Sequence, residues 1–180
     1  MIYSIRRYAM DLKRYIRDVP DFPEPGILFR DITPLLREPK ALAYALDRLS
    51  ERYRDAGVDA VVGIESRGFL LAAPLAANLG LPLVPIRKPG KLPAAHMTVE
   101  YALEYGTGEL GIHSDALERG ASAVIVDDLI ATGGTAEAAA RLVEMLGARV
   151  HSFAFLVELA DFGGRDRLSG YDVFTLVRYE

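Results

Sequence analysis

Apolar positions recur along the chain at two spacings, and each spacing predicts one kind of element. A spacing of three or four residues is typical of amphipathic helices, and it predicts helices at residues 5–16, from Pro39 to a cap at Gly57, and at residues 69–79 and 136–146. Short apolar runs predict strands, here at residues 60–64, 82–86, 123–126, 150–159 and 172–179. Because strands and helices alternate through the middle of the chain, the pattern predicts a parallel, doubly wound α/β core.

Other stretches follow neither spacing. Residues 21–26 contain two prolines, which restrict the backbone, and a short extended piece at residues 27–32 follows them. This rigid loop fits either a hydrophobic plug or the wall of a flat pocket. Residues 92–111 are mainly polar, with strand-like alternation only at residues 101–105, and a connection of this length is usually a lid or a disordered segment. One helical turn is expected at residues 115–119.

The composition bounds the class of protein. A length of 180 residues predicts one domain, residues 1–180, with a sizeable core. The formal net charge of -4 provides no basic field for nucleic acid or an anionic membrane. The absence of cysteine excludes thiolate catalysis and disulfides, and the 3 histidines do not have the spacing of a metal site. The N-terminal segment has no apolar signal-peptide core, so we expect a cytoplasmic protein that binds neither nucleic acid nor membrane.

The clearest chemistry lies in residues 123–135. An apolar strand is followed there by two adjacent carboxylates, Asp127 and Asp128, and then by a loop of small residues that ends at Thr135. Such a loop before a helix can bind phosphate through its backbone N–H groups and the positive helix end. The two acids suit the hydroxyls of a sugar. Ligands of α/β sheets bind at the carboxyl ends of the strands, which favours this interpretation over an ordinary connection with a solvated Asp pair.

Charged and small polar residues also follow the two preceding strands: Glu65, Ser66 and Arg67 after the first, and Arg87, Lys88 and Lys91 after the second. Arg67 stands beside a helix start and can hold an anion, although a local Glu65–Arg67 ion pair is the simpler alternative. Surface cations are usually only solvated, but the position of this cluster after a strand favours a second anion site.

Two common phosphate motifs give no support to other nucleotide enzymes. GxxxxGK[ST] does not occur, and GxGxxG occurs only as GTGELG at residues 106–111, where no helix is predicted to begin directly after it, so nucleoside triphosphatases and dinucleotide-binding enzymes lose their main support. A sugar-phosphate loop, a separate group of cations and a lid remain. This set suits a ribose that carries phosphate at one end and a second anionic group at the other.

Residues 125–135, with the sequence IVDDLIATGGT, resemble the phosphoribosyl-pyrophosphate (PRPP) signature of the type I phosphoribosyltransferases. Further segments resemble the adenine-specific branch of that family: DFPEPGILFRDITPLL at 21–36, GIESRGF at 63–69, IRKPGKLP at 86–93, LEYG at 103–106 and LVEL at 156–159. They occur in the family's order and cover nearly the whole chain, leaving mainly the first residues outside. Several motifs in order are far more specific than any one of them.

The resemblance implies the type I phosphoribosyltransferase fold. This is a parallel sheet core flanked by helices, with a small hood built from residues 1–36 and part of the C-terminal region, and a flexible lid at about residues 88–111. The implied reaction transfers ribose 5-phosphate from PRPP to adenine and gives AMP and pyrophosphate, a step of purine salvage. The implied cofactor is Mg²⁺, held mainly by PRPP and water with no direct protein ligand, and the implied assembly is a homodimer.

The resemblance also implies a role for each site residue. The 5-phosphate is held by Ala131, Thr132, Gly133, Gly134 and Thr135, and the ribose hydroxyls by Asp127 and Asp128. Pyrophosphate is held by Glu65 and Ser66 through their backbone, by Arg67, and by Arg87, Lys88 and Lys91, in part from a neighbouring subunit. Adenine lies against Phe29 and Leu159, and its edge is read by the backbone of Leu28 and Arg30. The catalytic group is Glu104, Arg67 and Tyr105.

One position within the signature points away from a related reaction. Phosphoribosyltransferases for 6-oxopurines usually carry an Asp where this chain has Ala131, and that Asp serves the N7 proton of the base. Ala131 cannot accept a proton, so the resemblance implies that Glu104 on the lid is the general base. Without that support, Glu104 would be taken as a solvated strand residue.

Other functions were weighed against this one. A 6-oxopurine or xanthine phosphoribosyltransferase is disfavoured by Ala131 and by the segment at residues 21–31. A non-enzymatic PRPP-sensing regulator would need a basic DNA-binding module before the core, for which the N-terminal segment leaves no room. A catalytically silent homologue is disfavoured because the acidic pair, Arg67 and Glu104 are all present.

Overall fold

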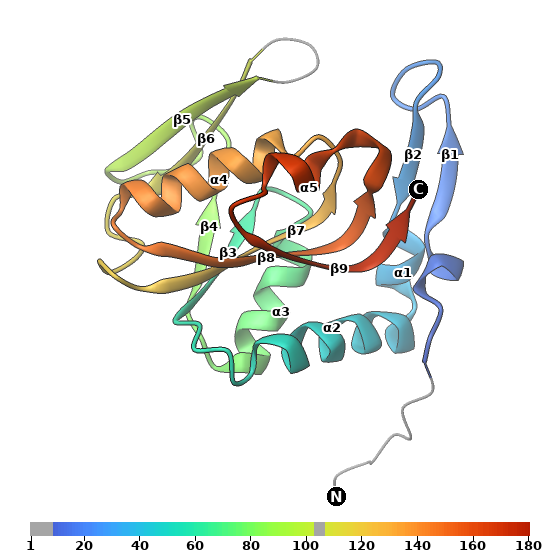
Figure 1. The fold of residues 1–180 in the computed structure, drawn as a ribbon, viewed down its shortest axis with the longest axis horizontal. Coiled ribbons are helices and arrows are strands. Elements are labelled where there is room, and N and C mark those ends of the chain that lie inside the picture. Colours follow the sequence, from blue (N-terminus) through green and yellow to red (C-terminus); the bar gives the residue numbers. More distant parts are fainter. Residues whose placement is uncertain (1–8, 103–106) are drawn as a thin grey trace, which may run out of the picture. The chain divides into compact units, whose positions relative to one another are not determined.

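The structure is a computed structural model, and it describes residues 9–102 and 107–180 of the chain. The chain divides into two compact units, residues 1–45 and 46–180, and each is described by itself. Figure 1 shows the elements along the chain. Among the described residues, no helix is both long enough and apolar enough to cross a membrane.

The first unit is built around a short hairpin. Its elements are the 3-10 helix η1 (Leu12–Tyr15), the antiparallel strands β1 (Arg17–Pro20) and β2 (Leu28–Asp31), helix α1 (Thr33–Arg37), and the start of helix α2 (Pro39–Tyr53), which continues into the second unit. Asp31 fixes the end of the hairpin, because it pairs with Arg17 (Nη2 to Oδ2, 2.5 Å) and accepts the Thr33 N–H at 2.9 Å. Phe22 and Phe29 meet edge to face at 5.1 Å.

The second unit contains a five-stranded sheet in the order β4-β3-β7-β8-β9, in which every neighbouring pair is parallel. Its strands are β3 (Ala60–Ile64), β4 (Leu83–Ile86), β7 (Ser122–Ile130), β8 (Arg149–Leu159) and β9 (Asp172–Tyr179). The predicted parallel α/β core is therefore confirmed, and β4 and β9 are the edge strands of this sheet.

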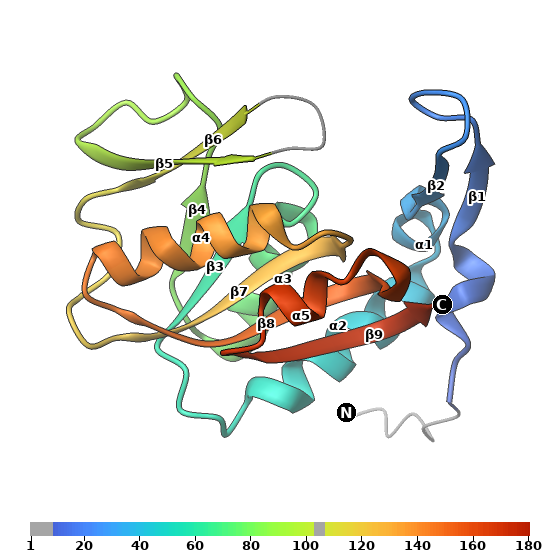
Figure 2. The ribbon, with the colours of Figure 1, turned by 45° about the horizontal axis from the view of Figure 1, so that its top comes forward.

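Helices cover both faces of this sheet, as Figures 1 and 2 show. Helix α3 (Phe69–Leu79) lies on one face, and helix α4 (Gly134–Met145) lies on the other. The α4 side holds the main core, in which small helix residues such as Ala139 pack against Phe153 and Phe155 of β8. The short helices η2 (Ala160–Phe162) and α5 (Gly164–Arg167) connect β8 to β9.

A second hairpin replaces the predicted polar loop at residues 92–111. Strands β5 (His96–Ala102) and β6 (Thr107–His113) pair antiparallel along their whole length. The loop interpretation was therefore wrong for most of this stretch. The polar residues His96, Thr98 and Glu100 of this ribbon are exposed, whereas Val99, Leu110 and Ile112 are buried.

Other predictions also need correction. The helix expected at residues 5–16 is only the 3-10 turn η1 within the described part, and the chain continues into a strand. Helix α1 was missed, because Thr33-Pro34 was taken as the end of the extended piece rather than the first turn of a helix. The helical turn expected at residues 115–119 is a non-helical turn. The strand predicted to end at Val126 continues to Ile130, so the acidic pair lies inside it.

Candidate active site

A cavity of about 330 Å³ opens where the central strands of the second unit end. Its lining comes from the loop after β3, the residue Lys88 after β4, the end of β7, the start of α4, and Tyr101 of the β5–β6 hairpin. The cavity brings together these predicted site residues: Glu65, Ser66, Arg67, Lys88, Asp127, Asp128, Ala131, Thr132, Gly133, Gly134 and Thr135. Arg87 and Lys91 reach the same region through Glu65.

The acidic pair lies in the part of β7 that is no longer paired with β3 but is still paired with β8. Pairing with β3 ends at Val126, whereas pairing with β8 continues to Ile130. Asp127 lines the cavity, and its Oδ1 accepts the backbone N–H of Asp128 at 2.8 Å. Asp128 is only 3% exposed. Its Oδ2 lies 2.8 Å from Nε of Arg67, so the buried carboxylate is charge-paired.

Both carboxyls resist ionisation. Burial raises the pKa of Asp127 well above its ordinary value, and the neighbouring Asp128 charge raises it further. Burial also raises the pKa of Asp128, although the Arg67 guanidinium opposes that effect. Two adjacent acids of this kind take up a proton more readily than solvated ones. A ligand that donates hydrogen bonds or brings positive charge would therefore relieve an unfavourable arrangement.

The loop from Ala131 to Thr135 leads directly into α4. Its Gly133 has φ of +80°, a conformation that glycine adopts without strain. No side chain caps the start of α4, so the first N–H groups of the helix are available to an anion. A glycine turn before an uncapped helix start is a geometry that suits an anion such as phosphate.

The cations after β4 are organised by Glu65. Its carboxylate accepts hydrogen bonds from Arg87 Nε at 2.9 Å, the Lys88 backbone N–H at 3.0 Å and Lys91 Nζ at 2.9 Å. Burial favours the protonated acid, but these donors outweigh it and lower the pKa of Glu65 to about 2. The local Glu65–Arg67 pair weighed as an alternative is not among the ion pairs of the described residues, in which Arg67 pairs with Asp128.

The predicted catalytic residues Glu104 and Tyr105 lie outside the described residues. Sequence reasoning missed Tyr101, which precedes them on β5 and lines the cavity. Its ring lies across Gly108 of β6, where a Cβ atom would come within 2.7 Å of it. The alternating pattern at residues 101–105 was the available signal, since it placed residue 101 on a strand.

The predicted adenine residues lie on two separate strands. Leu28, Phe29 and Arg30 form most of β2 in the first unit, where Leu28 is exposed and Arg30 pairs with Asp18. Leu159 ends β8 in the second unit. Among the described residues, no group of three or more His, Asp or Glu side chains gathers to hold a metal. The carboxylate oxygens in the cavity are nonetheless the donor type that Mg²⁺ prefers.

The comparisons with known proteins agree with this geometry. The phosphoribosyl transferase domain family matches residues 33–177. An adenine phosphoribosyltransferase from Cyanothece is 58% identical over 170 residues, which are 94% of this chain and 100% of the relative. The crystal structure of an adenine phosphoribosyltransferase from Thermoanaerobacter pseudethanolicus has a TM-score of 0.91 at 50% identity, covering 93% of this chain and 98% of that one. The enzyme from Saccharomyces cerevisiae, complexed with an imino-altritol bisphosphate and adenine, has a TM-score of 0.86 at 42% identity, covering 92% and 96%.

The raised pKa of Asp127 leads to a prediction about stability. A carboxyl whose pKa is raised by folding stabilises the fold below its unfolded pKa and loses that contribution as pH rises through its folded pKa. The change Asp127→Asn removes the ionisable group, so stability is no longer lost as pH rises. The amide oxygen can still accept the hydrogen bond from the Asp128 N–H. At pH 7.5 we expect the free energy of unfolding to rise by about 0.5–2 kcal/mol, and the gain over wild type to shrink toward pH 4.

Thermal and urea unfolding across that pH range would measure the effect. Asp115→Asn, a change at an exposed carboxylate in a turn, is the matched control and should leave stability nearly unchanged. A destabilised Asp127→Asn variant at pH 7.5 would contradict the assignment.

Proposed function

We propose the reaction of this chain from one premise: it belongs to the phosphoribosyltransferase family, and relatives along nearly its whole length are adenine phosphoribosyltransferases. The chain transfers ribose 5-phosphate from PRPP to N9 of adenine, and the products are AMP and pyrophosphate, a step of purine salvage. The observation that carries this function is the cavity in which an acidic pair stands between an uncapped helix start and a group of cations.

The sugar-phosphate end of PRPP binds along the end of β7. The loop Ala131–Thr135 receives the 5-phosphate through its N–H groups and the positive end of α4. Asp127 and Asp128 accept hydrogen bonds from the ribose hydroxyls. The raised pKa values of both acids support this role, because hydroxyl donors stabilise the ionised form that burial disfavours.

The pyrophosphate end binds beside the loop after β3. Arg67 holds it together with Lys88, and the Glu65–Ser66 backbone contributes the N–H group of Ser66, because the Glu65 N–H donates to the Ile86 carbonyl oxygen at 3.0 Å. The Glu65 carboxylate would repel pyrophosphate, so its role is to hold Arg87 and Lys91 in place. These cations meet the charge that develops on the leaving group as the bond to C1′ breaks.

Mg²⁺ is the proposed cofactor, bound mainly by PRPP and water. When bound, it neutralises charge on the departing pyrophosphate. The carboxylate oxygens of Asp127 and Asp128 would accept hydrogen bonds from the water molecules bound to Mg²⁺.

Adenine is the proposed acceptor, and the residues assigned to it are Phe29, Leu159, Leu28 and Arg30. The hood is assigned to residues 1–36 with part of the C-terminal region. Fixed backbone groups would match the amino donor and N1 acceptor of adenine and leave buried polar groups unpaired with a 6-oxopurine. Ala131 agrees with this selectivity, since it offers no carboxylate to the base.

Glu104 is the proposed general base, and Tyr105 accompanies it on the lid at about residues 88–111. The β5–β6 hairpin supports this placement, because Tyr101 of β5 already lines the cavity. A lid that closes over the site would also exclude water from the cation-like C1′ centre.

A homodimer is the proposed assembly. Helix α3 is apolar along nearly its whole length, yet its outer face exposes Leu70 (49%), Ala73 and Ala77. Leu83 of the edge strand β4 is 40% exposed as well. A second copy that covers this apolar surface would remove it from water. The cytoplasmic location stays a prediction.

The reaction can be tested with three bases. With PRPP and Mg²⁺, we expect adenine to give AMP and pyrophosphate at least about 100-fold faster than hypoxanthine or guanine, measured as kcat/KM. Turnover with a 6-oxopurine or xanthine instead would favour the related phosphoribosyltransferases. PRPP binding without turnover of any base would favour a PRPP-sensing regulator.

The role of Glu104 can be tested by Glu104→Gln. Because the amide cannot take a proton, we expect kcat to fall about 100-fold or more, while the Kd for PRPP, measured calorimetrically, stays within a factor of two. Glu100→Gln on the same hairpin is the matched control, since Glu100 is exposed. A near-wild-type kcat would remove Glu104 as the base.

The assembly can be tested by sedimentation. We expect the wild-type chain to sediment as a dimer and Leu70→Glu to shift it toward monomer, because a buried charge opposes association. Met145→Glu, at a residue 51% exposed on α4, should leave the dimer intact. A monomeric wild type would contradict the proposal.

A further inference from the structure

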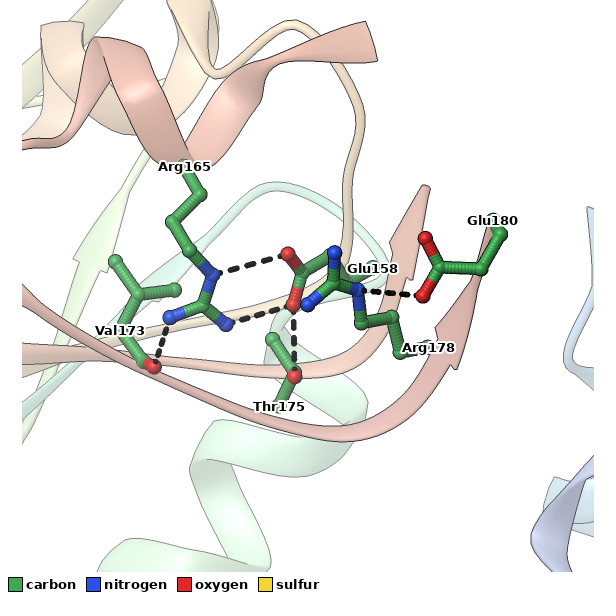
Figure 3. A network of polar contacts seen from close by, with 6 residues as sticks. All are labelled: Glu158, Arg165, Val173, Thr175, Arg178 and Glu180. Atoms are coloured by element: carbon green, nitrogen blue, oxygen red, sulfur yellow. Dashed lines mark hydrogen bonds and ion pairs between the residues drawn. The ribbon is translucent and has the colours of Figure 1, made fainter. Parts of the chain in front are cut away.

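A buried carboxylate outside the cavity is bound from several sides. Glu158, near the end of β8, is 3% exposed. Arg165 of α5 donates to both of its oxygens, from Nε to Oε1 at 3.0 Å and from Nη2 to Oε2 at 2.7 Å. Thr175 of β9 adds a hydrogen bond to Oε2 at 2.9 Å. Figure 3 shows how these groups converge on the carboxylate.

Arg165 is bound at its other nitrogen as well. Its Nη1 donates to the backbone carbonyl of Val173 at 2.8 Å. One guanidinium therefore ties α5 to the end of β8 and to β9. The Arg165 hydrogen bonds lower the pKa of Glu158, and the pair also raises the pKa of Arg165, so both groups stay charged.

The helix that Arg165 fixes is packed against the phosphate loop. A Cβ atom on Gly164, the first residue of α5, would lie 2.2 Å from the carbonyl oxygen of Ala131. A Cβ atom on Gly133 would lie 2.8 Å from the carbonyl oxygen of Gly164. The two backbones are thus in direct contact, with no side chain between them. Arg167, the last residue of α5, places its Nε 3.7 Å from Glu137 Oε2 in the first turn of α4.

We propose that Glu158 and Arg165 are positioning residues for the phosphate loop: they hold the Gly164 backbone against Ala131 and Gly133 and so set the geometry of the 5-phosphate site. This inference rests on the proposed binding of PRPP at Ala131–Thr135. Neither side chain is among the residues that line the cavity.

Stability alone does not account for this arrangement. A buried ion pair is often no more stabilising than apolar side chains of similar volume, whereas its directed hydrogen bonds fix one geometry. Binding sites lose function when their groups shift by about 1 Å. Because Gly164 meets the loop through backbone atoms, a shift of α5 is passed on to the loop directly.

The first test compares two arginine changes that each remove an ion pair to β8 or β9. Arg165→Met breaks the contacts with Glu158 and Val173, and Arg52→Met breaks the pair with Asp172 (2.5 Å), which is remote from the cavity lining. PRPP binding is measured calorimetrically with Mg²⁺ and without base. We expect Arg165→Met to raise the Kd for PRPP about tenfold, with kcat at saturating PRPP within about threefold of wild type, and Arg52→Met to leave that Kd within twofold.

Thermal unfolding of both variants shows whether the ion pair sets the geometry of the phosphate loop or only stabilises the fold. If Arg165→Met lowers Tm and leaves the Kd for PRPP within twofold of wild type, the pair only stabilises the fold and the proposal is overturned. Arg165→Lys should be intermediate, because one ammonium cannot reproduce the bidentate contact and also reach Val173.

A second test acts on the contact itself and leaves the ion pair in place. Gly164→Ala forces the Ala131 carbonyl to move, so we expect the Kd for PRPP to rise at least tenfold. Gly170→Ala is the matched control, because nothing lies within 4 Å of its added Cβ. An unchanged Kd in Gly164→Ala would overturn the proposal even if Arg165→Met did not fold.

These measurements stay informative if the proposed acceptor is wrong. PRPP binding is recorded without a base, so a wild-type chain that binds PRPP and rejects adenine refutes the adenine reaction and leaves the comparison of variants intact. A wild-type chain that does not bind PRPP refutes both.

Discussion

The site depends on one constraint, the unequal pairing of β7. This strand leaves β3 after Val126 and remains paired with β8 to Ile130. The unpaired side of its last residues forms one wall of the cavity, and the paired side keeps that wall rigid. Asp127 and Asp128 lie in this half-paired segment. The strand therefore holds two carboxyl groups next to each other although burial disfavours their ionised forms. The loop Ala131–Thr135 and the start of α4 come directly after Ile130, where β7 ends.

Charge around the cavity is balanced within the protein. The buried Asp128 pairs with Arg67, and Glu65 is surrounded by Arg87, Lys91 and the Lys88 N–H. In both arrangements the opposite charge offsets the cost of burying an ionised carboxylate. The cavity therefore presents a negative side along β7 and a positive side after β3 and β4, which matches a ribose between two anionic groups.

Much of this architecture was accessible from the sequence. Periodicity predicted α3, β3 and β9 with the bounds that the structure has. All residues of β3 are buried, and its apolar run is uninterrupted. The sequence predicted that Arg67 and the acidic pair lie at strand ends of one sheet, but it did not predict the ion pair that Arg67 forms with Asp128.

Other features were missed or lay beyond the reach of local pattern. Strand β5 does alternate, with Met97, Val99 and Tyr101 separated by exposed polar residues, but the segment was taken as a loop because alternation was recognised only at residues 101–105. The end of β7 was misplaced because charge was taken as a strand terminus, whereas pairing with β8 continues past it. The contact of Gly164 with Ala131 joins residues distant in the chain through backbone atoms, and no residue pattern reports such a contact.

The ion pair between Arg67 and Asp128 has a consequence for partial ligands. In the structure, the arginine assigned to pyrophosphate and the acid assigned to ribose form an ion pair at 2.8 Å. Binding is therefore an exchange of partners, and its free energy is a difference between two sets of contacts. A ligand that engages both ends replaces what each residue loses, whereas free phosphate or pyrophosphate compensates only one of them. With the proposed assignments, the site would therefore select the intact molecule over its fragments.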